Sequence, residues 1–309
     1  MKLFYRQIPA HEYGTYPLRF ERYRWFKPIL TGLIAFVIFL FLSNLVAGTA
    51  AALSGDLEGF LEAMAGGYDT FDAFSAAGAL ATLGSIAVMI PSILIASKIV
   101  RDRPFSSYGS AMGGFRMGLC LKSMIPALIA LAPSILIAFV AEGRVGENRF
   151  GIAGLLLCLV LTSLQCVAEE YMFRGFILQT VGSWTKVPFL GVLIQLLVFM
   201  LLHPYNAWGV LSVAVMGFAL GFLALYTKGL EAGAAFHIVN NLSGILLTGF
   251  GFGEISSVIG PKDALVSIGA TAVMVLLTVL LKEKFHFFDK VKKDDVSEFN
   301  LKYPAKEKI

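Results

Sequence analysis

The sequence predicts an all-α, polytopic transmembrane helical bundle of about eight helices with its active site inside the membrane. The 309-residue chain is 57% hydrophobic and only 15% charged, against roughly 25% charged residues in a soluble domain. Its mean hydropathy is +0.75, and its apolar residues gather in runs near the roughly 20-residue length that crosses a bilayer. The length suffices for one such bundle without a large soluble domain beside it.

Eight apolar runs are expected to form the helices, and they cover residues 28–52, 76–100, 119–141, 151–182, 187–204, 208–227, 230–251 and 264–282. The fifth run is short for a span, whereas the fourth is long enough to tilt or to project from the bilayer. Residues 1–27 then form a basic N-terminal segment. Residues 283–309 form a C-terminal tail without apolar periodicity, which we expect to be solvated and partly disordered.

The distribution of charge predicts the orientation of the bundle. Residues 1–27 hold six basic side chains against two acidic ones, and the tail after the last run is rich in lysine. The loop after the first run is acidic and contains no base; its acidic residues are Asp56, Glu58, Glu62, Asp69 and Asp72. By the positive-inside rule, both termini are cytoplasmic and the acidic loop is external. We therefore expect a multi-pass protein of the cell membrane, and the net charge of +4 needs no nucleic-acid partner to explain it.

Charged side chains interrupt the fourth run at Glu169, Glu170 and Arg174. A charge at the bilayer centre costs at least about 2.5–3.5 kcal/mol on insertion scales, so such a cluster is by default a functional site. Glu170 and Arg174 stand at i,i+4 on one helix face and are expected to pair. Because consecutive residues are turned by about 100°, the two glutamates should face different partners, which leaves Glu169 unpaired as a general base. The alternative is an ion network that only braces the bundle.

Two later runs carry further polar residues. His203 shares a helix face with Phe199, and Pro204 predicts that the helix ends at this histidine. The alternative for His203 is a packed or capping role. His237 and Asn241 also stand at i,i+4, and their two donors suit a developing oxyanion. The alternative for this pair is a polar clasp between helices.

These motifs are predicted to meet inside the membrane. Glu169 and His203 lie equally far from the turn near Lys186, so an antiparallel hairpin places them at similar depth. His237 and Asn241 lie roughly 14–20 Å into the seventh helix, at 1.5 Å per residue.

In this order on successive apolar runs, Glu-Glu-x-x-x-Arg, Phe-x-x-x-His and His-x-x-x-Asn resemble the CAAX protease and bacteriocin-processing family. Its members are Abi-type intramembrane proteases related to the prenyl-protein endopeptidase. The resemblance covers about residues 151–250, includes Gly175, and implies hydrolysis of a peptide bond within a bundle of about eight helices. The first 150 residues carry no motif of this kind.

The resemblance also implies roles, position by position. Glu169 with His203 would activate the attacking water, and His237 with Asn241 would stabilise the tetrahedral oxyanion. Glu170 with Arg174 would organise the first motif. The substrate would be a peptide or the tail of a membrane-associated protein.

A zinc ion is the open question of this site. Glu169, His203 and His237 are ligand types found in catalytic zinc sites. The chain has no His-Glu-x-x-His, however, and an asparagine suits an oxyanion better than zinc. We favour a metal-free glutamate mechanism, with zinc as the alternative.

Two functions from other classes compete with proteolysis. A proton-coupled transporter could use the same glutamates and histidines as a relay. Transporters commonly contain internal repeats, and no motif recurs in the first half of this chain. A non-catalytic immunity or scaffold protein would use the polar core only for packing.

Overall fold

A computed structural model describes residues 12–66, 72–253 and 256–304. Lys2, Arg6 and Asp69, which contribute to the predicted charge bias, lie outside these ranges. Within them the chain forms helices and no β-strand. The long helices are α1 (Lys27–Leu53), α7 (Met117–Leu136), α8 (Ile152–Glu170), α10 (Pro188–Leu201), α11 (Ala207–Thr227), α12 (Glu231–Gly249) and α13 (Pro261–Phe285).

Three helical runs contain a π-helical stretch, a local widening that is frequent at functional sites. The second run is built from α3 (Ala76–Ala79), the π-helix η2 (Leu80–Gly84), α4 (Ser85–Ala87) and α5 (Met89–Val100). The helix α7 continues into the π-helix η3 (Ile137–Glu142). The helix α8 continues through the π-helix η4 (Tyr171–Leu178) into α9 (Gln179–Thr185). The π-helix η4 begins directly after Glu170 and contains Arg174.

The predicted fold class is confirmed. Each of the eight expected runs contains a helix, and six helices in the described ranges are long and apolar enough to cross a membrane. The fourth run is 34 residues long, as its length in the sequence suggested. The fifth, α10, has only 14 residues. The seventh, α12, is not among the six, and it carries His237 and Asn241.

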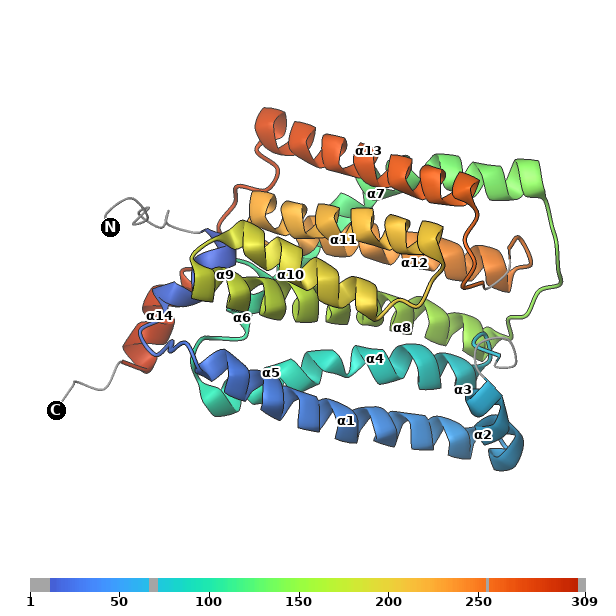
Figure 1. Cartoon of the computed structure of the whole chain (residues 1–309), viewed down its shortest axis with the longest axis horizontal. Helices are drawn as coiled ribbons and strands as arrows, with labels where there is room; N and C mark the ends of the chain where they lie inside the picture. Colours follow the sequence, from blue (N-terminus) through green and yellow to red (C-terminus); the bar gives the residue numbers. More distant parts are fainter. Residues whose placement is uncertain (1–11, 67–71, 254–255, 305–309) are drawn as a thin grey trace.

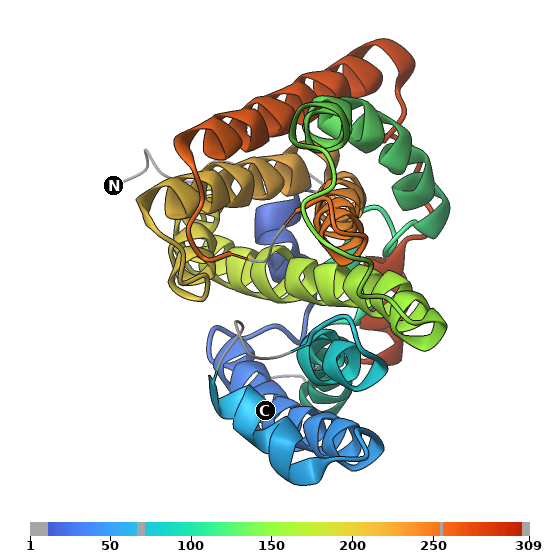
Figure 2. The ribbon, with the colours of Figure 1, turned by 90° about the vertical axis from the view of Figure 1, so that its right-hand side faces the viewer.

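The helices lie side by side along the long axis of the molecule (Figure 1). The helix α1 and the α3–α5 run pack together as one group, and α8 contacts that group on one side and α12 on the other (Figures 1 and 2). The helix α12 also contacts α7 and α11. Residues 231–239 of α12 are all buried. Small residues at its start allow this close packing, and a Cβ at Gly233 would lie 3.3 Å from Oε2 of Glu170.

Short elements cover one end of the bundle: η1 (Tyr13–Arg19), α6 (Ser106–Gly109) and α14 (Asp295–Lys302). The carboxylate of Asp295 accepts hydrogen bonds from Tyr16 (2.5 Å) and Ser106 (2.8 Å). Phe299, one turn further along α14, packs edge-on against Phe20. The expected disorder is therefore absent at residues 295–302, which form a docked helix, whereas the exposure of Ser297, Glu298, Leu301 and Lys302 agrees with a solvated segment. This helix is held by Tyr16 and Phe20 of the N-terminal segment, which periodicity within the tail does not reveal.

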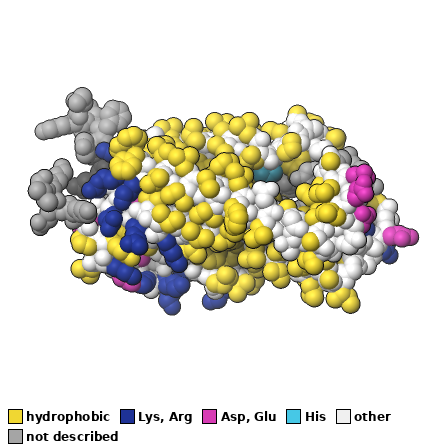
Figure 3. Space-filling view, turned by 90° about the horizontal axis from the view of Figure 1, so that it is seen from below, with side chains coloured by type: hydrophobic (Ala, Val, Ile, Leu, Met, Phe, Trp, Pro, Cys, Tyr) yellow, Lys and Arg dark blue, Asp and Glu magenta, His cyan; other side chains and the backbone are white. Residues whose placement is uncertain are grey.

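The surface has the character of a membrane protein. Figure 3 shows Lys and Arg gathered at one end of the molecule, Asp and Glu at the other, and hydrophobic side chains between them. We call these the basic end and the acidic end. The basic end contains η1, α6 and α14, and the acidic end contains the loop after α1. That the basic end faces the cytoplasm remains a prediction from the positive-inside rule.

Candidate active site

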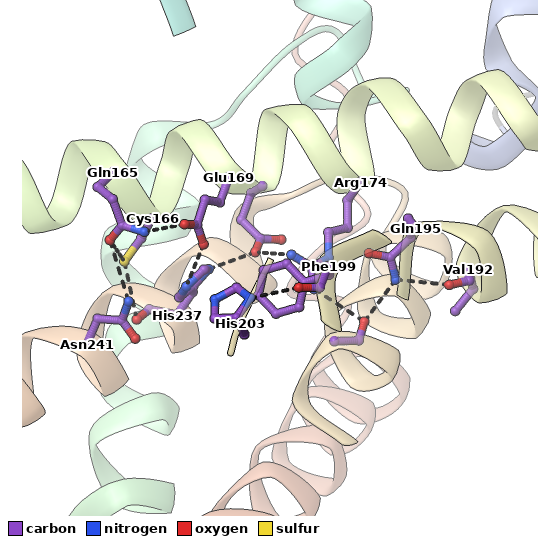
Figure 4. Close-up of polar contacts among 12 residues, drawn as sticks. Gln165, Cys166, Glu169, Arg174, Val192, Gln195, Phe199, His203, His237 and Asn241 are labelled. Carbon is purple, nitrogen blue, oxygen red and sulfur yellow. Dashed lines mark hydrogen bonds and ion pairs between the residues drawn. The ribbon is translucent and has the colours of Figure 1, made fainter. Parts of the chain in front are cut away.

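One histidine joins the two glutamates at the interface of α8 and α12 (Figure 4). The Nδ1 atom of His237 lies 2.9 Å from Oε1 of Glu170, and its Nε2 lies 3.4 Å from Oε2 of Glu169. The side chain of His237 is 3% exposed, and those of Glu169 and Glu170 are 10% and 1% exposed. The imidazole ring thus bridges the two carboxylates inside the bundle.

This bridge corrects two sequence-based expectations. The glutamates do share a partner, because an imidazole presents nitrogens on two different edges. A ring between two diverging carboxylates can therefore meet both. Glu169 is also not isolated, since its Oε1 accepts a hydrogen bond from Gln165 (2.6 Å). Its Oε2 makes no hydrogen bond within the described chain, which leaves one carboxylate oxygen with acceptor capacity.

The expected pair of Glu170 and Arg174 is present. Their closest atoms, Oε1 and Nη1, are 2.9 Å apart, and Arg174 is fully buried. The second guanidinium nitrogen of Arg174 donates to the carbonyl oxygen of Gly217 on α11 (3.3 Å). The guanidinium carbon lies 4.6 Å from the ring centroid of Phe199 on α10, a favourable cation–π distance. Arg174 therefore ties the first motif to two neighbouring helices.

His203 lies just beyond the end of α10, as its position before proline predicted. It is half-buried, and its Nδ1 lies 2.7 Å from the carbonyl oxygen of Phe199. Because a carbonyl only accepts, Nδ1 carries the proton of this bond, and a neutral ring has its lone pair on Nε2. The Phe199 ring centroid lies 4.4 Å from that of His203 and 6.4 Å from that of His237. Both histidines thus border one aromatic side chain, although no hydrogen bond in the described ranges joins His203 to Glu169.

Asn241 faces α8 together with His237, as the i,i+4 spacing predicted. Its Nδ2 lies 3.5 Å from Oε1 of Gln165, and its Oδ1 accepts from Nδ2 of Asn240 (3.0 Å). Asn240 and Asn241 are both half-buried. The amide of Asn241 is therefore held at the border between the buried cluster and more open space.

Two glutamines belong to this network and were not predicted. Gln165 stands one helical turn before Glu169 and links its carboxylate to Asn241. Gln195, fully buried on α10, donates to the same Gly217 carbonyl oxygen as Arg174, at 3.0 Å. Each glutamine lies four residues before a motif residue in an apolar run. This i,i+4 spacing is the sequence feature that could have identified both glutamines.

The three candidate zinc ligands do not form a metal-binding set in this arrangement. No group of three or more His, Cys, Asp or Glu side chains in the described residues has metal-binding geometry. Both ring nitrogens of His237 face carboxylates, and Nδ1 of His203 is engaged by a backbone carbonyl. The side chains as placed therefore do not fit a His-His-Glu zinc site.

Comparison with known proteins agrees with the motifs. Residues 151–243 match the family model described as type II CAAX prenyl endopeptidase Rce1-like. The chain is also similar to the uncharacterized protein YyaK of Bacillus subtilis (strain 168), with 29% identity over 169 residues. That alignment covers 50% of this chain and 55% of YyaK, so the match spans about half the length of the relative. No solved structure matches significantly. The resemblance to CAAX-type proteases is confirmed for the motif-bearing region.

Proposed function

We propose that this chain, whose residues 151–243 carry the sequence of the Rce1-like family, is an intramembrane endopeptidase. Its substrate would be a peptide or a segment of a membrane-associated protein. The observation that carries the proposal is the buried contact of His237 with both glutamates. At 3.4 Å, Nε2 of His237 approaches Oε2 of Glu169 without forming a hydrogen bond, and within the described chain this oxygen has no other hydrogen-bond partner.

Water activation is the role that suits Glu169. Its Oε1 is held by Gln165, so Oε2 is the oxygen available to take a proton from water. The activated water would attack the peptide carbonyl carbon. The C–N bond then breaks as the departing amine receives that proton. In this scheme His203 orients the water through its free Nε2.

Oxyanion stabilisation is the role that suits Asn241. Its amide is a neutral donor that Gln165 links to Glu169, and such donors act where charge develops in the transition state. His237 was expected to share this role. Because both of its ring nitrogens face carboxylates, we assign it to positioning Glu169 and Glu170. Glu170 and Arg174 complete the support of the site.

The test is cleavage of a defined peptide pool by the purified protein in lipid nanodiscs, read by mass spectrometry. The pool would contain unmodified and lipidated peptides. New peptide termini are expected with the unmodified chain and with the matched control Glu58→Gln, an exposed glutamate of α2 (Leu57–Gly66). They should be absent with Glu169→Gln. Equal cleavage by Glu169→Gln, or no cleavage of any peptide by the unmodified chain, would contradict the proposal.

Metal dependence is tested on the same preparation. We propose that the reaction needs no metal, because the candidate ligands contact one another and a backbone carbonyl instead of converging on a common point. Protein stripped with a strong chelator should retain its activity. Inactivation that added zinc reverses would recast Glu169, His203 and His237 as ligands.

A further inference from the structure

We infer that the glutamate–histidine cluster opens toward the acidic end of the bundle and receives an extended peptide segment from there. The inference rests on the proposed function for its substrate. The direction of access to the cluster does not depend on the proposed function. Four features of the described residues support it.

The first is an asymmetry along α12. Residues 231–239, on the basic side of the site, are all buried, whereas residues 240–248 are half-buried or exposed. Gly244 lies one turn beyond Asn241 and seven residues beyond His237, so all three share a helix face. Gly244 is exposed, and a Cβ built on it would meet no atom within 4 Å. The space next to the site on this side is therefore open.

The second feature is the short helix α10. Its 14 residues span about 21 Å at 1.5 Å per residue, less than the roughly 30 Å of a bilayer core. The chain leaves helical geometry before His203, and α11 begins only at Ala207. Non-helical backbone at membrane depth is tolerated where it is buried in protein or lines a water-filled cavity. Leu202 is 65% exposed, and a histidine side chain is visible midway along the surface in Figure 3. The chain next to His203 is therefore non-helical and partly exposed.

The third feature is the polarity of the residues that border this space. Gln165, His203, Asn240 and Asn241 contribute amides and an imidazole, and polar groups at membrane depth characteristically face water or a partner. Amides and imidazoles can pair with the main chain of an extended peptide. An acyl chain would leave them unpaired.

The fourth feature is the closure of the basic end. Arg116, at the start of α7, forms two contacts of 2.8 and 3.0 Å with Glu231, the first residue of α12. The same arginine donates to the carbonyl oxygen of Phe288 (2.8 Å). Tyr13 donates to the carbonyl oxygen of Tyr108, and Arg103 stacks on the Tyr108 ring at 3.7 Å. Packed side chains thus separate the cluster from the basic end. With the predicted orientation, the substrate segment would come from outside the cell or from the outer leaflet.

Thiol accessibility tests the direction without any substrate. Gly244→Cys is placed in the full chain and treated in sealed vesicles with a charged, membrane-impermeant maleimide. Ser54→Cys at the acidic end and Ser297→Cys at the basic end report which face is outward. The native Cys120, Cys158 and Cys166 are buried, and the unmodified chain serves as background. The matched control is Gly269→Cys on α13, an exposed helical glycine that also has no atom within 4 Å of a built Cβ.

The expected result is that Gly244→Cys reacts in vesicles where Ser54→Cys reacts and not where Ser297→Cys reacts. Gly269→Cys should resist the charged reagent because it faces lipid. Reaction of Gly244→Cys from the basic end would overturn the inference. So would reaction only with an apolar maleimide, which would show lipid in this space instead of water. His203→Cys provides a second test, and it should be labelled by the charged maleimide in the same vesicles as Gly244→Cys. Because no reading depends on turnover, a failure here is distinguishable from a failure of the protease proposal.

Discussion

The Nδ1 atom of His237 on α12 lies 2.9 Å from the carboxylate of Glu170, the last residue of α8. The same carboxylate oxygen also pairs with Arg174. Glu170 is therefore the shared acceptor of a cation and an imidazole, and all three side chains are buried. This makes Glu170 a structural residue to a degree that the adjacent Glu169 is not.

The first prediction separates the two glutamates by stability. Glu170→Gln leaves Arg174 without its counter-charge in a buried site, and losing one partner of a buried pair costs about 3–5 kcal/mol. Glu169→Gln should remain folded, because Glu169 pairs with no guanidinium. It should be inactive, because the general base is removed. Thermal melts in detergent should show a clear drop only for Glu170→Gln. Equal melting temperatures of the two variants would mean that the roles assigned here are wrong.

The second prediction compares a buried and an exposed ion pair. Glu231→Gln strands Arg116, whose side chain is 9% exposed, so a loss of about 3–5 kcal/mol is expected. Asp72→Asn breaks the pair with Arg149, where the side chains are 51% and 45% exposed, and should cost at most about 1 kcal/mol. Denaturant unfolding measures both. A small effect of Glu231→Gln would show that α12 is held at its basic end by packing alone.

The sequence predicted those parts of the site that local geometry decides. The pairing of Glu170 with Arg174 and the common face of His237 and Asn241 follow from helical spacing, and both are present. The end of α10 before His203 follows from the adjacent proline. The eight apolar runs follow from hydropathy and the length of a membrane span.

The rest depends on how helices are rotated against one another. Whether His237 meets one glutamate or both depends on the position of α12 relative to α8, which no spacing within either helix encodes. The pair of Arg116 and Glu231 joins residues far apart in sequence, so no local spacing predicts it. The docking of α14 likewise required Tyr16, far away in the N-terminal segment.

The third prediction concerns the amide beside the base. Asn241→Ala should lower kcat by about 10²–10³-fold, the scale for removing one oxyanion donor, with KM little changed. The protein should remain folded, because Asn241 is half-buried and its bond to Gln165 is long at 3.5 Å. Steady-state kinetics on a peptide from the cleaved pool provide the measurement. An increase in KM at constant kcat would instead assign Asn241 to substrate binding.

The fourth prediction uses pH. Burial raises the pKa of Asp102, which lies beyond the end of α5 and is 1% exposed. When the pKa of a carboxyl group is higher in the folded state than in the unfolded state, its contribution to folding stability is greatest below the unfolded-state pKa, which is about 3.9 for aspartate. That contribution is lost as pH rises through the folded pKa.

The substitution Asp102→Asn removes the titrating group and with it the loss of folding stability at higher pH. The variant should therefore gain stability relative to the unmodified chain as pH rises from about 4 toward neutrality. Melting temperatures across that range are the measurement. A constant difference between the two proteins at all pH values would show that Asp102 does not titrate differently on folding.

The central claim is that Glu169 activates a water molecule to hydrolyse a peptide bond inside the bundle. Digestion of the peptide pool in H2¹⁸O tests it most directly, with mass spectrometry of the products. The account predicts one ¹⁸O atom in each newly formed carboxylate with the unmodified chain and with Glu58→Gln, and no such product with Glu169→Gln. New peptide termini without ¹⁸O in the unmodified reaction, or ¹⁸O-labelled products from Glu169→Gln at the rate of the unmodified chain, would contradict it.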